Sequence, residues 1–408
     1  YRYMRGFGFN FEELEKDGRF LFIEMLTMKE RGISTVLDWT IDKIQSFKAQ
    51  RLVIDSFSAM AQAFKEQIDV RVITHLILSR IVRQIGCTTI IISEIPIGEQ
   101  KIGLGVEEFI ADGVIIFKMD EIDERLIRDL EIMKLRGTEL HEKKAIFTLK
   151  DGFKVFPSFK AESIEKPKRF QPIPDPPGRF STGIPEFDRL LDGGFPRGAF
   201  MLLEVDEHIT TFQYHLIVSP IGWNFLAKGN AVIVIPSSGV DYNIVKERVL
   251  GAGFTEDEIN NLLRVCVQEG LETPDLPYIA KFKGKDLERN HLQYIGMVKD
   301  LMSKSGKPVL SIIGADTMLS RYGIEEVIEI ANIDATRLRQ GGCLGITILK
   351  PGYDRLAKIL GAIADVHLKI TREHGTLLLY GIKPRTGIYA VEMDVTKGYV
   401  MPKLTPII

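Results

Sequence analysis

Short runs of β-branched and aliphatic residues alternate with longer stretches that carry apolar side chains at helical spacing. Residues 70–85 show this helical spacing, with Arg71, Arg80 and Arg83 on the other positions. The apolar runs are nearly continuous, which is typical of strands buried on both faces of a parallel sheet. They lie at 51–55, 88–93, 113–117, 199–205, 231–235, 308–313, 345–349 and 366–370. The alternation predicts α/β architecture, built twice along the chain.

A proline-rich stretch separates the two halves. Six of the 18 prolines fall within residues 157–178, and apolar periodicity is lost there. Such a composition predicts a stiff, extended linker. The expected organisation is a first repeat at 1–157, a linker at 158–178 and a second repeat at 179–408.

Four pairs of short motifs recur between the halves at an offset of about 250 residues. They indicate a tandem duplication. The pairs are GFGFNFEE (6–13) with GAGFTEDE (251–258), IAD (110–112) with IAD (363–365), KLR (134–136) with KPR (383–385), and GFKVFP (152–157) with GYVMP (398–402).

The second repeat has a front part that the first repeat lacks, from Phe180 to about Lys246. The first repeat is therefore expected to lack its N-terminal portion in this chain, and the sequence is interpreted as a fragment. Without its first strands, a parallel sheet would have a long unpaired edge and a half-exposed core.

Composition excludes several classes of protein. The chain is 45% hydrophobic and 26% charged, as in soluble globular proteins, and no apolar run approaches the roughly 20 residues that span a bilayer. A net charge of −2 gives no overall attraction to nucleic acid. Cys87, Cys266 and Cys343 lie far apart without metal-ligand spacing, so reduced buried thiols and a cytoplasmic location are expected.

Candidate chemistry lies where the predicted strands end. Asp55 ends the run RLVID, at the edge of a parallel sheet where open α/β folds bind ligands. A carboxylate there can hold Mg²⁺ through water, or it can simply cap the helix that follows. Ser93 and Glu94 end the next run, where they could sense a γ-phosphate and the attacking water, or equally cap the strand end.

Several longer motifs resemble the KaiC family of RecA-like P-loop ATPases, over nearly all of the chain outside the linker. In the first repeat these are RGFGFNFEELEKDGRFLFIEM, RLVIDSFSAM, SEIPIGEQKIGLGVEEFIADGVIIF, LEIMKLRGTE and FTLKDGFKVFP. In the second repeat STGIPEFDRLLDGGFPRGAF is similar to the opening segment of the family's domain. The resemblance implies two RecA-like domains, Mg²⁺ and ATP as cofactors, and a homo-oligomer in the form of a hexameric ring.

The resemblance also implies roles for individual residues. Lys134 and Arg136 are two apart on a predicted strand, so both point to one side, and the pair is similar to a finger that reaches the γ-phosphate of the neighbouring subunit. A solvated strand edge is the alternative. The positions assigned to the nucleotide by resemblance are Arg128, His141, Asp151 and, in the second repeat, Lys383 and Arg385, whose role stays open.

The second repeat departs from the family at three places, and we expect it to be a pseudo-ATPase. A functional phosphate loop needs glycines and a Lys before Ser or Thr, but LLEVDEHITTFQYHL (202–216) has neither and carries Asp206 and Glu207 instead. Ser237 and Ser238 stand where the family has paired catalytic carboxylates. Gly314 stands at the position of the strand-end aspartate, and Asp316 comes two places later.

Three functions remain open on the sequence alone. The first is an ATPase ring whose first repeat hydrolyses Mg-ATP, provided that an intact phosphate loop precedes Tyr1, while the second repeat serves assembly or an unknown protein partner. The second is a non-catalytic regulator or scaffold similar to the archaeal gas-vesicle regulators of the GvpD type. The third, nucleic-acid handling, is disfavoured because the basic stretch KPKR (166–169) is short and lies in the linker.

Overall fold

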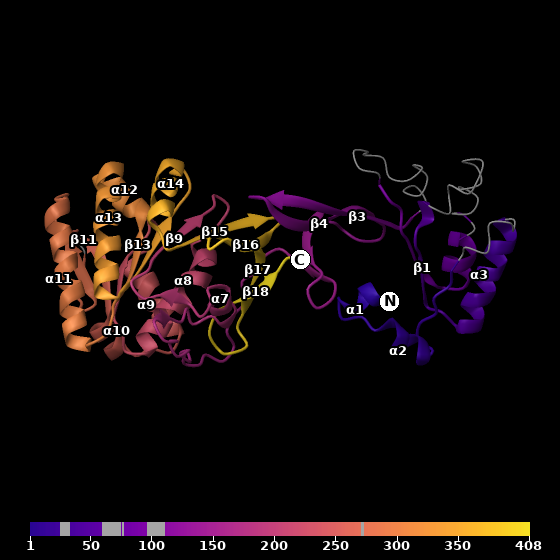
Figure 1. Ribbon diagram of the computed structural model, residues 1–408, viewed down its shortest axis with the longest axis horizontal. Coiled ribbons are helices and arrows are strands. Elements are labelled where there is room, and N and C mark those ends of the chain that lie inside the picture. Colours follow the sequence, from indigo (N-terminus) through magenta and orange to yellow (C-terminus); the bar gives the residue numbers. More distant parts are fainter. Residues whose placement is uncertain (25–32, 59–74, 76, 96–110, 271–272) are drawn as a thin grey trace. The chain divides into compact units, whose positions relative to one another are not determined.

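The computed structural model describes residues 1–24, 33–58, 75, 77–95, 111–270 and 273–408. Figure 1 shows how their helices and strands are arranged. The chain forms two compact units, one of Tyr1–Lys118 with Leu130–Lys144 and one of Met119–Asp129 with Ala145–Ile408. The boundary between the units does not lie in the proline-rich stretch. Instead, a short piece of the first repeat and its last residues belong to the second unit.

The first unit contains a small parallel α/β element. Its elements are α1 (Arg2–Arg5), α2 (Phe11–Lys16), α3 (Ile33–Phe47), β1 (Arg51–Ile54), the π-helical segment η2 (Ile77–Gln84) and β2 (Thr88–Ile91). β1 and β2 pair in parallel with Ile54 opposite Ile91, so both predicted strands are confirmed. Most of the first half of the helix predicted over 70–85 lies outside the described residues.

One face of the β1–β2 pair carries the core of this unit, and its other face is open. Ile44, Phe57, Ile77, Ile81 and Cys87 are buried together. The side chains of alternate strand residues, Val53 and Ile90, are each 56% exposed. These two runs were predicted to be buried on both faces, and for Val53 and Ile90 that prediction is wrong.

The next four strands form a different sheet. β3 (Gly113–Ile122), β4 (Arg125–Leu135), β5 (Lys144–Thr148) and β6 (Lys154–Phe156) form four strands in that order, while β1 and β2 form a separate pair. Among the described residues, no strand joins β2 to β3. Ile115 and Phe117 of β3 are more than half exposed, so the prediction that this run is buried on both faces is wrong.

The second unit is built on one large sheet. Its strands are β9 (Phe200–Val205), β10 (Val232–Ile235), β11 (Leu263–Gln268), β12 (Ile279–Phe282), β13 (Leu310–Gly314), β14 (Leu344–Leu349), β15 (Val366–Glu373), β16 (Thr376–Lys383), β17 (Ile388–Asp394) and β18 (Met401–Pro406). Their order is β12-β11-β10-β13-β14-β9-β15-β16-β17-β18. The pairs from β12 to β15 are parallel, and the last three pairs are antiparallel. The five strands predicted for the second repeat are confirmed, and the fold is the expected RecA-like α/β fold.

Helices cover the parallel part of this sheet. They are α7 (Pro185–Leu190), α8 (Thr211–Ala227), α9 (Tyr242–Gly251), α10 (Glu256–Leu262), α11 (Leu287–Ser305), α12 (Ala315–Tyr322), α13 (Ile324–Gly341) and α14 (Asp354–Ile363). A two-stranded pair of β7 (Arg179–Phe180) and β8 (Phe195–Pro196) flanks α7. Among the described residues, no helix is long and apolar enough to cross a bilayer.

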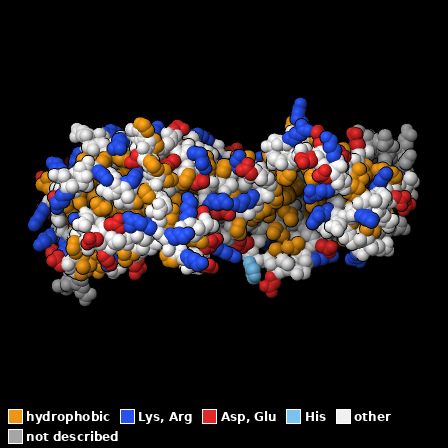
Figure 2. Space-filling model, turned by 90° about the horizontal axis from the view of Figure 1, so that it is seen from below, with side chains coloured by type: hydrophobic (Ala, Val, Ile, Leu, Met, Phe, Trp, Pro, Cys, Tyr) orange, Lys and Arg blue, Asp and Glu red, His pale blue; other side chains and the backbone are white. Residues whose placement is uncertain are grey.

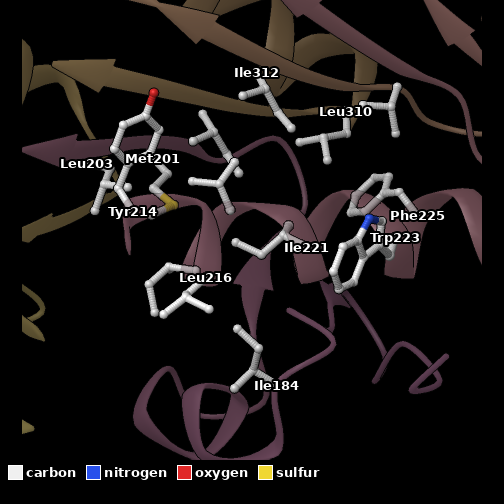
Figure 3. Close-up of a cluster of buried hydrophobic side chains, with 14 of the residues drawn as sticks. Ile184, Met201, Leu203, Tyr214, Leu216, Ile221, Trp223, Phe225, Leu310 and Ile312 are labelled. Atoms are coloured by element: carbon white, nitrogen blue, oxygen red, sulfur yellow. The ribbon is translucent and has the colours of Figure 1, made fainter. Parts of the chain in front are cut away.

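Alternate residues of a strand point to opposite faces of the sheet and pack in two separate cores. Met201 and Leu203 of β9 pack with α8 in one core, and Figure 3 shows these side chains beside Tyr214, Ile221 and others of the same cluster. Phe200 and Leu202 pack in the other core, with residues of α11 to α14. Because β9 is buried on both faces, its sequence is apolar at nearly every position.

The proline-rich stretch lies against the second unit. It has no helix or strand up to β7, as predicted. However, Phe170 is 1% exposed and packs between Trp223 and Tyr399, and Arg169 forms two hydrogen bonds with Glu258. A single buried aromatic residue gives no periodic signal, which is why the sequence showed only a linker here.

The turn of the β3–β4 hairpin is embedded in the second unit. The guanidinium of Arg125 lies over the ring of Tyr380, 4.8 Å from its centroid, and donates hydrogen bonds to the carbonyl oxygens of Gly381 and Thr386 at 2.7 and 2.8 Å. Tyr380 in turn donates a hydrogen bond to Asp123 at 2.6 Å. Arg125 is only 7% exposed, so these partners must offset the cost of burying its charge.

Candidate functional site

The first repeat places three predicted residues at one edge of its strand pair. Asp55 directly follows β1, and Ser93 and Glu94 follow the end of β2. Since β1 and β2 are parallel, with Ile54 opposite Ile91, these side chains leave the sheet at the same edge.

Three hydrogen bonds hold the two strand ends together. The Ile92 amide donates to the Ile54 carbonyl at 2.9 Å, and the Phe57 amide donates to the Ile92 carbonyl at 2.7 Å. The Glu94 amide donates to the hydroxyl of Ser58 at 2.9 Å. Phe57 is fully buried, so the backbone on either side of Asp55 and before Glu94 is anchored.

This edge presents oxygen ligands to solvent. Asp55 and Glu94 are exposed, and Ser93 is half-buried. Within the described residues, no group of three or more His, Cys, Asp or Glu side chains could hold a metal ion by itself. One or two carboxylates with water and substrate phosphates is the usual way in which proteins bind Mg²⁺, so the edge suits a magnesium ion that arrives with a phosphate ligand.

Lys134 and Arg136 lie at the end of β4, also in the first unit. The strand ends at Leu135, so Lys134 is on it and Arg136 is one residue beyond. The amide of Arg136 donates to the Asp112 carbonyl at 2.8 Å, and its guanidinium Nη1 lies 3.3 Å from Asp112 Oδ1. Both side chains of this ion pair are more than half exposed. Exposed pairs are weak, so a phosphate could replace Asp112.

Three further positions were assigned to the nucleotide by resemblance. His141 lies in an exposed loop, 3.6 Å from Glu139. Asp151 occupies the exposed turn between β5 and β6 with φ of 57°, beside Lys150. Arg128 belongs to the second unit, where its Nε donates to the carbonyl oxygen of Ile408 at 2.5 Å.

Lys383 and Arg385 both have partners within the second unit. The ammonium of Lys383 donates to the carbonyl oxygen of Ala364. The guanidinium of Arg385 donates to the carbonyl oxygen of Glu124 at 3.0 Å and lies 3.5 Å from the Glu124 carboxylate. These contacts favour a structural role for the pair, which the sequence had left open.

In the second repeat, side chains of the loop itself satisfy the amides that a phosphate would need. Asp206 follows β9, and its carboxylate accepts hydrogen bonds from the His208 amide at 3.4 Å and the Thr371 hydroxyl at 3.1 Å. Thr210 caps α8 by accepting from the Gln213 amide, and Gln213 reaches back to the Thr210 amide. A phosphate at this helix start would compete with a carboxylate and a complete capping box.

The position of the strand-end aspartate is sterically closed. Gly314 ends β13, and a Cβ atom at this residue would lie 2.5 Å from the backbone of Ser237. Real Cβ atoms do not approach backbone atoms so closely. No residue other than glycine fits at position 314 unless the segment after β10 moves.

Asp316, two positions later, is used internally. Its Oδ2 accepts a hydrogen bond from the Ser238 amide at 2.9 Å and lies 3.0 Å from the ammonium of Lys350. Lys350 also donates to the carbonyl oxygen of Ser238 at 2.6 Å. The ammonium of Lys350 thus neutralises the Asp316 carboxylate.

Two half-buried cations near this cluster, Arg248 and Lys350, act on His215. Burial, together with the nearby charges of Arg248 and Lys350, holds the pKa of His215 well below its usual value of 6.5. The imidazole is therefore neutral at physiological pH. Burial also lowers the pKa of Arg248.

Sequence reasoning missed Lys350 and Arg248. The sequence could have revealed Lys350, because this residue directly follows the apolar run of β14, just as Asp55 follows that of β1. The proximity of Arg248 to His215 could not be found in this way, because Arg248 lies within α9 and carries no motif.

Comparisons with known proteins agree with this geometry. Residues 1–159 match the family described as "ATPase: KaiC". The chain is 26% identical to protein GvpD2 of Halobacterium salinarum over 73% of this chain and 62% of that protein. It is 28% identical to the circadian clock oscillator protein KaiC of Synechococcus elongatus, over 64% of this chain and 50% of that protein.

A shorter relative is matched over more of its own length than these two proteins. A UPF0273 protein of Methanocaldococcus jannaschii is 32% identical over 38% of this chain and 69% of that protein. The chain spans less than two thirds of the GvpD proteins that it matches, 62% of GvpD2 and 65% of GvpD1. From the matched family, the relatives and the RecA-like sheet, we conclude that the chain belongs to the KaiC-like family of P-loop ATPases.

Proposed function

We propose that this protein is an ATP-dependent ring component in which the first repeat supplies a catalytic edge and the second repeat does not hydrolyse nucleotide. The proposal rests on one observation, the difference between the strand ends at corresponding positions of the two repeats. In the first repeat Asp55 and Glu94 leave neighbouring parallel strands side by side and face solvent. In the second repeat Gly314 is closed by Ser237 and Asp316 is neutralised by Lys350.

In this proposal each residue of the first repeat has a distinct role. Asp55 would hold Mg²⁺ through water, and the metal would stabilise negative charge on the phosphates of ATP. Ser93 and Glu94 orient the γ-phosphate and the attacking water. Lys134 and Arg136 reach the γ-phosphate of the neighbouring subunit, where they stabilise the charge of the transition state.

The proposed ring follows from the direction of this contact. A finger that serves the neighbour makes a head-to-tail interface, and such an interface closes into a ring when its rotation allows. We propose six subunits, a cytoplasmic location and ATP with Mg²⁺ as the bound cofactors. Light scattering of the natural gene product with a non-hydrolysable ATP analogue should give a mass near six subunits, whereas a monomer would contradict the ring.

The test of the catalytic edge is Mg²⁺-dependent release of phosphate from ATP by the natural gene product. Asp55→Asn should lower turnover by roughly 100-fold or more, because the carboxylate that holds the metal through water is lost. Glu207→Gln is the matched control, since Glu207 is exposed in the degenerate loop of the second repeat and its change should leave turnover unaltered. Equal turnover in Asp55→Asn and the unchanged protein would overturn the assignment.

A second function, that of a non-catalytic regulator or scaffold, is favoured by one observation. The GvpD relatives match a larger share of the chain, 73%, than the KaiC of Synechococcus elongatus, 64%. No phosphate release by the natural gene product, with a ring still formed, would favour this function. On the face seen in Figure 2, basic and acidic side chains of the described residues are interspersed, which does not favour a nucleic-acid surface there.

A further inference from the structure

Ser58 joins the segment that carries Asp55 to the segment that carries Glu94. The hydroxyl oxygen of Ser58 accepts a hydrogen bond from the Glu94 amide at 2.9 Å, across 36 positions of the sequence. Ser58 is half-buried and belongs to the same short turn as Asp55. Of the three hydrogen bonds that hold the two strand ends together, this is the one made by a side chain, so a substitution can remove it.

The backbone pairing of the two segments ends before it reaches Glu94. Ile92 makes the last backbone hydrogen bonds on its segment, with its amide to the Ile54 carbonyl and with its carbonyl from the Phe57 amide. Within the residues that the structure describes, no backbone-to-backbone hydrogen bond continues to Glu94. The Ser58 hydroxyl therefore holds a peptide group that lies beyond the paired backbone.

Ser58 is itself fixed by the residue before it. Phe57 is fully buried, and its amide donates to the Ile92 carbonyl at 2.7 Å. The backbone at Ser58 cannot shift without moving a core side chain, which protein interiors resist because they are close-packed. The hydrogen bond to this hydroxyl then sets where the Glu94 carboxylate can reach.

The corresponding hydroxyl of the second repeat has a different partner. Counted from the strand-end position, Ser58 corresponds to Thr317. The Thr317 hydroxyl donates to the carbonyl oxygen of Pro236 at 2.7 Å. Pro236 follows β10, whereas the strand that corresponds to β2 is β14, which pairs with β13 as β2 pairs with β1. The link from this hydroxyl to the neighbouring strand end is thus a feature of the repeat that carries Asp55 and Glu94.

We propose that Ser58 is a positioning residue for ATP hydrolysis by the first repeat, an inference that rests on the function proposed above. By holding the Glu94 amide, the hydroxyl fixes the Glu94 carboxylate relative to that of Asp55. Ser58 touches neither the nucleotide nor the metal in this role. A misplacement of about 1 Å can lower the rate of an enzyme about 100-fold, and the orientation of the attacking water matters more in the transition state than in the ground state.

The kinetic test uses the natural gene product. Ser58→Ala should lower kcat by roughly 10- to 100-fold and change the KM for ATP by less than about threefold. Ser58→Thr keeps a hydroxyl and should retain kcat within about threefold, since the second repeat has Thr317 at the corresponding position. Ser46→Ala is the matched control. The Ser46 hydroxyl, on the exposed surface of α3, donates to the Lys43 carbonyl at 3.1 Å, and its loss should leave kcat and KM unchanged.

Hydrogen exchange, read residue by residue by mass spectrometry, tests the contact without nucleotide. Ser58→Ala should raise the exchange rate of the Glu94 amide by about tenfold or more, because that amide loses its acceptor. The Ile92 amide should change less than about threefold, since its acceptor is the Ile54 carbonyl, and it reports that the variant is folded. Ser58→Thr and Ser46→Ala should leave both amides as in the unchanged protein.

These measurements distinguish failure of this inference from failure of the proposed function. If the unchanged protein releases no phosphate, the proposed hydrolysis is wrong, and the role of Ser58 in it falls as well. If the unchanged protein is active, an unaltered exchange rate of Glu94 in Ser58→Ala would show that the hydrogen bond does not form. Faster exchange of Glu94 with undiminished kcat would show that its placement does not limit turnover, and faster exchange of Ile92 as well would make Ser58 a general structural residue. Each of these results would overturn the positioning role.

Discussion

Ser237 lies directly against Gly314, so that a Cβ atom at Gly314 would come within 2.5 Å of the Ser237 Cα. The two residues follow β10 and end β13, which are neighbouring parallel strands. Their contact explains why the second repeat lacks a strand-end aspartate, since the chain after β10 occupies the space that the side chain would need. Restoring the aspartate alone would therefore not restore a magnesium site.

We expect Gly314→Ala to lower the free energy of unfolding by about 1–3 kcal/mol, because the methyl group clashes with backbone rather than with a side chain. Gly222→Ala in α8 is the control, since its nearest neighbour would be Ile312 Cδ1 at 3.8 Å. That change should stabilise the protein slightly, by up to about 1 kcal/mol, because alanine is the better helix former. Urea unfolding measures both. An equal effect of the two substitutions would show that position 314 is not closed.

We expect Asp316→Asn to lower the free energy of unfolding by about 2–3 kcal/mol, because it leaves the ammonium of Lys350 partly buried without its counter-charge. The side chains of Asp316 and Lys350 are 9% and 26% exposed. Asp300→Asn breaks an ion pair with Lys304 whose side chains are both more than half exposed, so it should cost under about 0.5 kcal/mol. If Asp316→Asn costs no more than this control, the cluster is not structural.

We expect Arg136→Ala in the natural gene product to lower kcat by roughly 10³-fold, with little change in ATP affinity, because the finger acts mainly on the transition state. Phosphate release and ATP titration separate the two effects. Asp112→Ala is the informative control, since Asp112 is the ion-pair partner of Arg136 in the described chain. Its loss should leave kcat within about threefold if Arg136 works on the neighbouring subunit.

Mixing two inactive proteins tests the same contact between subunits. Arg136→Ala and Asp55→Ala should regain partial turnover when mixed, because some interfaces then join an intact Asp55 to an intact Arg136. If mixed rings form and turnover does not return, Arg136 has a structural role with Asp112.

We expect the contribution of Glu258 to stability to depend on pH. Its hydrogen bonds with Arg169 and, to a lesser degree, with Thr255 lower the pKa of Glu258 from about 4.5 to about 2. A lowered pKa means that the stabilisation is fully present above about pH 4.5 and is lost as the pH falls toward 2. Glu258→Gln should cost about 1–2 kcal/mol at pH 7, after allowance for the exposure of Arg169, and progressively less below pH 4.5.

Denaturant unfolding at several pH values measures the difference between Glu258→Gln and the unchanged protein. Glu325→Gln, in an ion pair with Arg355 whose side chains are both about two thirds exposed, should show a difference under about 0.5 kcal/mol at every pH. A constant difference for Glu258→Gln would contradict the assigned pKa.

The sequence predicted the strands that are buried on both faces, because continuous apolar runs such as that of β14 have few other interpretations. It did not predict β18, whose Pro402 and Pro406 favour an irregular segment. Proline is tolerated there because β18 is the last strand of the sheet and needs hydrogen bonds on one side only. It also gave no sign that Phe170 anchors the proline-rich stretch.

For the candidate site, the sequence indicated which residues end the strands, and the structure gave their partners. Asp55, Ser93 and Glu94 were found because strand ends follow from apolar runs. The pair of Lys350 with Asp316 joins the residue after β14 to one in α12, which follows β13, and requires the folded sheet. The same is true of the Ser237 backbone beside Gly314, which sequence alone showed only as a missing carboxylate.

The buried guanidinium of Arg125 has an evolutionary consequence. Arg125 and Asp123 come from the first repeat, yet they hold Tyr380 and the carbonyl groups of Gly381 and Thr386 within the second compact unit. A gene rearrangement that exchanged the second repeat at the proline-rich stretch would separate these groups from their partners. After such an exchange the contacts would form only if the incoming repeat carried the same partners for Arg125 and Asp123.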